Sequence, residues 1–117
     1  MISLLWFLGS IKAQDWNLVG QPILGSASGN KAGNCIDING DGTVMAVGEP
    51  LHDSGGILSG RVSVYTLQSG TWVLKGSVLL SATNEDMFGN AVSLSDDGNI
   101  LAVGVKMNDE NGENDGN

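Results

Sequence analysis

An internal repeat with a period of 56 residues constrains the fold of this chain more than any other feature. Residues 16–61 align without a gap on residues 72–117, and 14 of the aligned pairs are identical. The alignment superposes Trp16 on Trp72 and carries many further like-for-like pairs. Self-similarity at a fixed period indicates copies of one supersecondary unit that bury their faces against one another. We therefore expect two repeats, 16–71 and 72–117.

Within each period the sequence has the pattern of short β-strands joined by tight Gly-containing turns. Residues 35–38 and 91–94 alternate in polarity, as half-buried strands do. No segment has a helical period. The expected strands are 16–24, 35–38, 44–47, 61–67, 71–80, 91–94 and 100–103. The sequence thus predicts an all-β fold of four-stranded antiparallel units, which is typical of a β-propeller fragment with one full blade and partial neighbours.

The repeated tryptophans serve as a test of this interpretation. We interpret Trp16 and Trp72 as large packing residues at equivalent places between neighbouring units. Unlike environments for the two side chains would contradict the equivalence of the units. His52 and Arg61, which the second copy replaces by asparagines, are interpreted as an ordinary loop residue and a surface charge at a strand end.

Charge and composition exclude several functional classes. The chain has 13 Asp and Glu residues against 5 Lys and Arg, so its net charge of -8 opposes a nucleic-acid partner. Its single cysteine, Cys35, cannot form an intrachain disulfide or a thiolate zinc cluster. With one histidine, His52, and no Gly-x-Gly-x-x-Gly loop, the sequence predicts neither enzymatic activity nor a bound cofactor.

Residues 1–13 have the features of a secretory signal peptide. Ile2–Ile11 is an uncharged apolar run, too short to span a bilayer but matching the apolar core of such a signal. Because no basic residue precedes the run, a buried strand or a short core helix is the alternative. A signal peptide predicts a secreted or cell-surface protein whose mature chain, 14–117, has no membrane span.

The repeat resembles a known family. Residues 88–95, FGNAVSLS, followed by Ala102-Val103-Gly104, resemble the FG-GAP repeat, which forms the seven-bladed propeller at the head of integrin α chains and occurs in many secreted bacterial proteins. The first copy carries Val47-Gly48-Glu49-Pro50 where the family has Val-Gly-Ala-Pro, and in the second copy Val105-Lys106 replaces Ala-Pro. The resemblance covers residues 16–117 and implies a fold rather than a function.

Some FG-GAP repeats bind Ca²⁺ in the turn between their first two strands, and the resemblance implies a candidate site here. Asp37, Asn39 and Asp41 supply three oxygen-bearing side chains at alternate positions, whereas Ca²⁺ prefers six to eight oxygen ligands. The position of the family's last ligand is held by Met45, which cannot bind the ion. The second copy keeps only Asp97. An ordinary β-turn is the alternative explanation for both loops.

These observations favour a non-catalytic, secreted or cell-surface β-propeller module for recognition of a protein or glycan, or for adhesion. The alternatives are a propeller attached to a larger secreted enzyme and a Ca²⁺-stabilised structural repeat. Because propellers need roughly four to eight blades, we expect the chain to be the N-terminal part of a longer protein that supplies the remaining blades. Its loops 49–60 and 105–116 are expected to lie together on one face.

Overall fold

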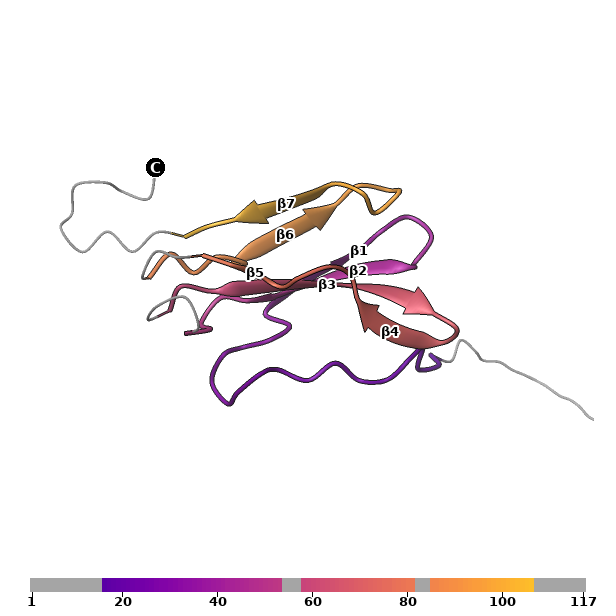
Figure 1. The fold of residues 1–117 in the computed structure, drawn as a ribbon, viewed down its shortest axis with the longest axis horizontal. Coiled ribbons are helices and arrows are strands. Elements are labelled where there is room, and N and C mark those ends of the chain that lie inside the picture. Colours follow the sequence, from indigo (N-terminus) through magenta and orange to yellow (C-terminus); the bar gives the residue numbers. More distant parts are fainter. Residues whose placement is uncertain (1–15, 54–57, 82–84, 107–117) are drawn as a thin grey trace, which may run out of the picture.

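The computed structural model describes residues 16–53, 58–81 and 85–106, and within them the fold is all-β, with antiparallel sheets and no helix (Figure 1). The expected signal peptide and most of the loop 105–116 lie outside the described residues. The strands are β1 (Cys35–Ile38), β2 (Val44–Glu49), β3 (Arg61–Gln68), β4 (Thr71–Leu74), β5 (Leu79–Leu80), β6 (Ala91–Leu94) and β7 (Leu101–Gly104).

Two sheets contain these strands. In the first sheet, β1, β2, β3 and β4 pair in chain order, every pair antiparallel, and β5 pairs with the start of β3. The second sheet is the β6–β7 hairpin. Ser69 and Gly70, at the β3–β4 turn, both have positive φ, the geometry that two-residue turns need to match the twist of antiparallel strands. The meander therefore follows from local turn chemistry.

The two copies of the repeat share one backbone conformation. Five residues with positive φ in the first copy have a positive-φ residue 56 positions later: Gly20 and Gly76, Gly29 and Glu85, Lys31 and Met87, Gly33 and Gly89, Gly42 and Gly98. The strand registers agree as well, because Ile36 pairs with Val47 as Val92 pairs with Val103. The sequence alignment is thus also an alignment of backbone geometry.

Two of the expected strands differ in the structure. Residues 71–80, expected as one strand, divide into β4 and β5, because the backbone turns at Gly76, where φ is +72°. The strand expected at 16–24 is wrong. This segment lies beside Trp72 of β4, but the hydrogen bonds between them run through the side chains of Gln21 and Trp72, so no backbone ladder forms.

The expectation of like environments for the two tryptophans is also wrong. Trp72 is 8% exposed, whereas Trp16 is 98% exposed. The indole Nε1 of Trp72 donates a hydrogen bond to the carbonyl oxygen of Val19 at 3.0 Å, and Gly20 lies against the ring. Val19 and Gly20 of the first repeat therefore cover Trp72, and no described residue covers Trp16 in this way. The equivalence of the copies extends to the backbone but not to this packing position.

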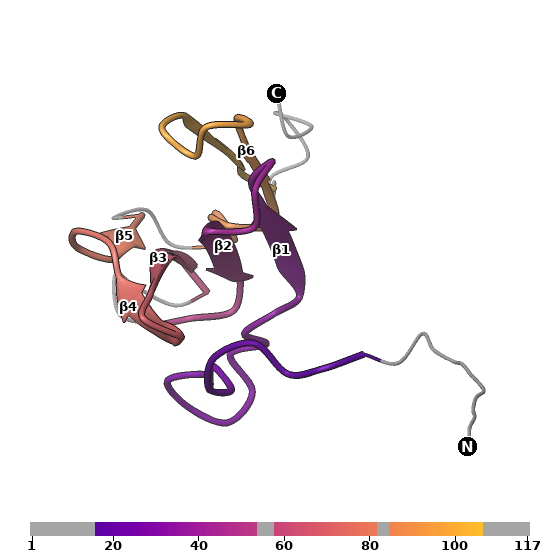
Figure 2. The ribbon, with the colours of Figure 1, turned by 90° about the vertical axis from the view of Figure 1, so that its right-hand side faces the viewer.

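The second sheet packs against the first, with β6 alongside β1 and β2 (Figures 1 and 2). The apolar core lies on the neighbouring strands β2, β3 and β4 and consists of Val44, Ala46, Val47, Val62 and Trp72. Both backbone and side-chain hydrogen bonds join the two repeats. The amide of Phe88 donates to the carbonyl oxygen of Ser59 at 2.9 Å, and Gly60 forms an isolated parallel bridge with Phe88.

Candidate functional site

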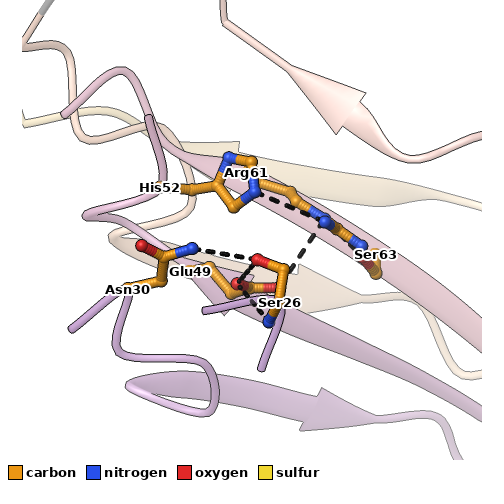
Figure 3. A network of polar contacts seen from close by, with 6 residues as sticks. All are labelled: Ser26, Asn30, Glu49, His52, Arg61 and Ser63. Carbon is orange, nitrogen blue, oxygen red and sulfur yellow. Dashed lines mark hydrogen bonds and ion pairs between the residues drawn. The ribbon is translucent and has the colours of Figure 1, made fainter. Parts of the chain in front are cut away.

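A buried ion pair joins the end of β2 to the start of β3. Glu49 and Arg61 are direct cross-strand partners in the antiparallel register. Their side chains meet with Arg61 Nε 3.6 Å from Glu49 Oε2, and the Glu49 side chain is 5% exposed against 22% for Arg61 (Figure 3). A buried carboxylate is costly unless it is paired and hydrogen-bonded. The register of the hairpin therefore supplies the counter-charge that this burial requires.

The other oxygen of Glu49 holds the loop 26–30. Glu49 Oε1 accepts hydrogen bonds from the Ser26 hydroxyl at 2.9 Å and from the Ser26 amide at 3.4 Å. The Asn30 side chain continues the chain of contacts, since its Nδ2 donates to Ser26 Oγ at 2.9 Å. The carboxylate of Glu49 thus lies at the centre of the network, with the loop on one side and the guanidinium on the other (Figure 3).

His52 links the network to the following loop. Its ring Nε2 lies 3.4 Å from a terminal nitrogen of Arg61. Because a guanidinium has only donors, this contact is a hydrogen bond when Nε2 is unprotonated and the ring proton is on Nδ1. The main chain of His52 also accepts from the Gly60 amide at 2.9 Å and donates to the Glu49 carbonyl oxygen at 3.1 Å. These bonds tie together the two ends of the segment between β2 and β3.

A pocket of about 450 Å³, open to solvent, lies beside this network. It is lined by Ser26, Ala27, Ser28, Asn30, His52 and Asp53. One wall is the loop 26–30 and the other is the start of the β2–β3 connection. The walls are joined by the Leu51 amide, which donates to the Asn30 carbonyl oxygen at 3.3 Å. A pocket with polar side chains on both walls can receive a polar ligand.

The structure places the three residues of the expected calcium site in hydrogen bonds of the β1–β2 turn and of the contact between the sheets. Asn39 Oδ1 accepts from the amides of Thr43 and Val44 at 2.9 and 2.8 Å, and its Nδ2 donates to the Asp96 carbonyl oxygen at 3.1 Å. The oxygen that would bind the ion is therefore saturated by its own turn.

The two carboxylates of that expected site have separate structural roles. Asp37 Oδ2 accepts from the Leu94 amide on the second sheet at 2.6 Å. The hydroxyl and the amide of Thr43 both donate to Asp41, and the hydroxyl bond is the main reason why the pKa of Asp41 lies below its usual value. In residues 16–53, 58–81 and 85–106, no three His, Cys, Asp or Glu side chains are placed to hold a metal ion. Calcium binding at these residues stays a prediction.

The interpretation of Arg61 as a surface charge is wrong, because the side chain is largely buried and paired with Glu49. His52 is 5% exposed and contributes to the network rather than projecting from a loop. Glu49 was not identified from the sequence. Its signals are an acidic residue at the end of the apolar run 44–48 and the departure from alanine in the family pattern, where the second copy has Val105.

Comparisons of the chain with protein-family models, with curated proteins and with solved structures found no match. Across the segments that the structure describes, none of the backbone forms a helix of the length and apolarity that crossing a bilayer requires.

Proposed function

We propose that this chain contributes units to a β-propeller that acts, without catalysis, as a recognition module for a protein or glycan ligand at the cell surface or after secretion. The observation that carries the proposal is the pattern of covered and uncovered faces on the two units. The resemblance of residues 88–95 to the FG-GAP repeat and the apolar run Ile2–Ile11 give additional support for the propeller and for export.

Equivalent side chains differ in whether a neighbouring unit covers them. Val92 and Leu94 lie half-buried on β6, the strand that packs against β1 and β2. Their equivalents Ile36 and Ile38 are 59% and 50% exposed. Contiguous exposed apolar side chains mark interaction surfaces. By analogy with this contact, we infer that another unit of the same kind covers Ile36 and Ile38.

The opposite face also differs between the two units, because a neighbouring unit covers it in the first unit only. On β1, Asp37 and the thiol of Cys35 accept hydrogen bonds from amides of β6. Their equivalents on β6, Ala91 and Ser93, are exposed. Each unit therefore has one face that packs against the following unit and an opposite face that packs against the preceding unit. Such units extend into a closed ring or an array.

The chemistry of the network around Glu49 supports recognition over catalysis. A serine nucleophile needs a base within hydrogen-bond reach, but the Ser26 hydroxyl donates to the carboxylate of Glu49, which is occupied by Arg61. The imidazole of His52 faces the same guanidinium. These groups hold one another in place and stabilise the loop 26–30, as the walls of a binding site require.

The test of recognition uses the full chain on two arrays, one of glycans and one of extracellular proteins, alongside hydrolysis assays with chromogenic esters and glycosides. We expect saturable binding to at least one array and no turnover. Turnover that survives purification, or no binding on either array, would overturn the proposal.

Sedimentation velocity tests the stacking part of the proposal. We expect the full chain to associate in a concentration-dependent way, and Ile38→Asp to abolish the association because it places a charge on the uncovered face. Val73→Asp is the matched control, since Val73 is also an exposed apolar strand residue but lies on β4. Equal association of the wild type and Ile38→Asp would contradict the stacking.

A further inference from the structure

The pocket between the loop 26–30 and residues 51–53 is fixed before any ligand arrives. Ser26 is held by two hydrogen bonds to the buried carboxylate of Glu49. The main-chain amide of Asn30 donates to the Ala27 carbonyl oxygen at 3.3 Å, which closes the turn at the tip of the loop. The second wall is held by Asp53, whose Oδ1 accepts from the Leu58 amide at 2.8 Å. A preorganised site loses little conformational entropy on binding.

The orientation of the Asn30 side chain follows from the network. The single hydroxyl proton of Ser26 goes to Glu49 Oε1, so Ser26 Oγ can only accept from Asn30. Asn30 must therefore present its NH₂ group to Ser26 and direct its Oδ1 the other way, as Figure 3 shows. The chemistry of three residues thus determines which end of the amide remains for a ligand.

Asn30 Oδ1 is an acceptor without a protein donor in the described part of the chain. Asn30 is 9% exposed and lines the pocket, and within the described part of the chain no hydrogen bond reaches its Oδ1. In the open pocket this oxygen can accept a hydrogen bond from water or from a ligand that offers an N–H or O–H group. The pocket is therefore suited to a hydrogen-bond donor rather than to an apolar molecule.

The remaining lining selects among donors. Ser28 and Asp53 are exposed on the pocket walls; the hydroxyl can donate or accept, and the carboxylate accepts only. An anionic ligand would be repelled by Asp53 and by the net charge of -8. A cationic ligand would find one carboxylate in the lining. A neutral polyol offers both donors and acceptors, and thus matches an amide oxygen, a hydroxyl and a single carboxylate together.

We propose that this pocket binds one sugar residue of a glycan, with ligand hydroxyls donating to Asn30 Oδ1 and Asp53 and exchanging a hydrogen bond with Ser28. Its volume of about 450 Å³ lies within the range of small-molecule sites, roughly 300–1,000 Å³. The site belongs to the first repeat alone, because the second has Ala82 and Asp86 in place of Ser26 and Asn30. The inference rests on the proposed recognition function and assigns it a site and a ligand class.

The test is saturation-transfer NMR of the full chain with galactose, mannose and N-acetylglucosamine, with arginine and inorganic phosphate as comparison probes. We expect at least one sugar to bind, and Asn30→Ala and Ser28→Ala each to weaken it about tenfold, the change that 1.4 kcal/mol produces. Ser28→Ala serves as the second variant because the Ser28 side chain is exposed and its removal leaves the Glu49 network intact. Asn34→Ala, an exposed asparagine outside the pocket lining, is the matched control and should bind as the wild type does.

Three results would overturn the inference: no sugar binding, binding of arginine or phosphate only, or sugar binding that Asn30→Ala and Ser28→Ala leave unchanged. The protein array separates this failure from failure of the proposed function. If one of these three results occurs and the chain still binds an extracellular protein, the sugar site is wrong and the recognition function stands. If neither array binds the chain, both are wrong.

Discussion

Gly48 and Gly89 bring the two units into backbone contact: a Cβ on Gly48 would lie 2.2 Å from the carbonyl oxygen of Gly89. Gly48 is on β2 of the first sheet and Gly89 precedes β6 of the second. A backbone oxygen cannot move aside as a side chain can. The glycine in the repeated Ala-Val-Gly motif is therefore required by the contact with the next unit rather than by its own strand.

Gly48→Ala should destabilise the chain by about 3 kcal/mol, because overpacking typically costs about 1–3 kcal/mol and this clash involves the backbone. Gly104→Ala is the matched control at the same repeat position. Its Cβ would meet the Ala91 Cβ at 3.0 Å, which a small shift relieves, so we expect a cost of about 1 kcal/mol or less. Urea unfolding measures both. Equal destabilisation by the two variants would contradict the close approach of the sheets.

Gly20→Ala and Gly76→Ala test how Trp72 is covered. Both glycines have positive φ, +75° and +72°. An alanine in this left-handed conformation destabilises the fold by about 1–2 kcal/mol at either position. Only at Gly20 would the Cβ also lie 2.5 Å from Trp72 Cδ1, whereas at Gly76 nothing lies within 4 Å. We expect Gly20→Ala to lower the Tm further than Gly76→Ala and to shift tryptophan emission to longer wavelength. Equal Tm values would show that the segment 16–24 does not pack on Trp72.

The features that the sequence predicted correctly are local. Alternating polarity located β1 and β6, and the Asp-Gly pairs located the hairpin turns, since Gly42 and Gly98 both take positive φ. These signals depend on residues a few positions apart, which a single sequence contains in full. Antiparallel pairing of β1 with β2, of β3 with β4 and of β6 with β7 then follows from their short connections.

The features that the sequence did not reveal depend on distant partners. The burial of a tryptophan depends on the segment that covers it, and the residues around Trp16 resemble those around Trp72 too closely to distinguish the two. The pairing of Glu49 with Arg61 depends on the register across a twelve-residue separation, and the role of Ser26 depends on a contact 23 residues away. Residue type alone indicates a solvated charge for Arg61, and only the buried carboxylate opposite it overrides that expectation.

Glu49→Val and Arg61→Asn convert the ion pair to the residues of the second repeat, and their double-mutant cycle measures the coupling. Each single change leaves a partly buried charge without its partner, for which we expect a cost of about 3 kcal/mol. The double variant should be less destabilised than the sum of the singles, by about 1–3 kcal/mol. Urea unfolding at one pH and salt concentration provides all four values. Strict additivity would contradict a coupled pair.

Calorimetric titration with Ca²⁺ tests the expected site at Asp37, Asn39 and Asp41. Ion binding there requires Asn39 Oδ1 to leave the amides of its turn, and the site has two carboxylates. We therefore expect at most weak binding, with a Kd no tighter than about 10⁻³ M, and loss of the heat in Asp41→Ala. No heat at millimolar Ca²⁺ would end the calcium prediction, and tight binding would contradict the hydrogen bonding of the turn.

The turns between the first two strands of each unit should make the chain less stable in acid. The pKa of Asp97 lies below its usual value of 3.8, first because the Asn99 amide donates to its carboxylate and then because the Ser95 hydroxyl does. The hydroxyl and amide of Thr43 lower the pKa of Asp41 in the same way. A carboxyl group with a depressed folded-state pKa stabilises the fold above pH 3.8 and loses that contribution as the pH falls through the folded-state pKa. NMR titration of the folded chain should therefore place both pKa values below 3.8, and thermal unfolding should show falling stability across the same acidic window.

Thr43→Val removes the hydroxyl donor, so it should raise the pKa of Asp41 and leave that of Asp97, in the same sample, unchanged. If the pKa of Asp41 does not move in this variant, the hydroxyl bond does not stabilise the charged form of the carboxylate.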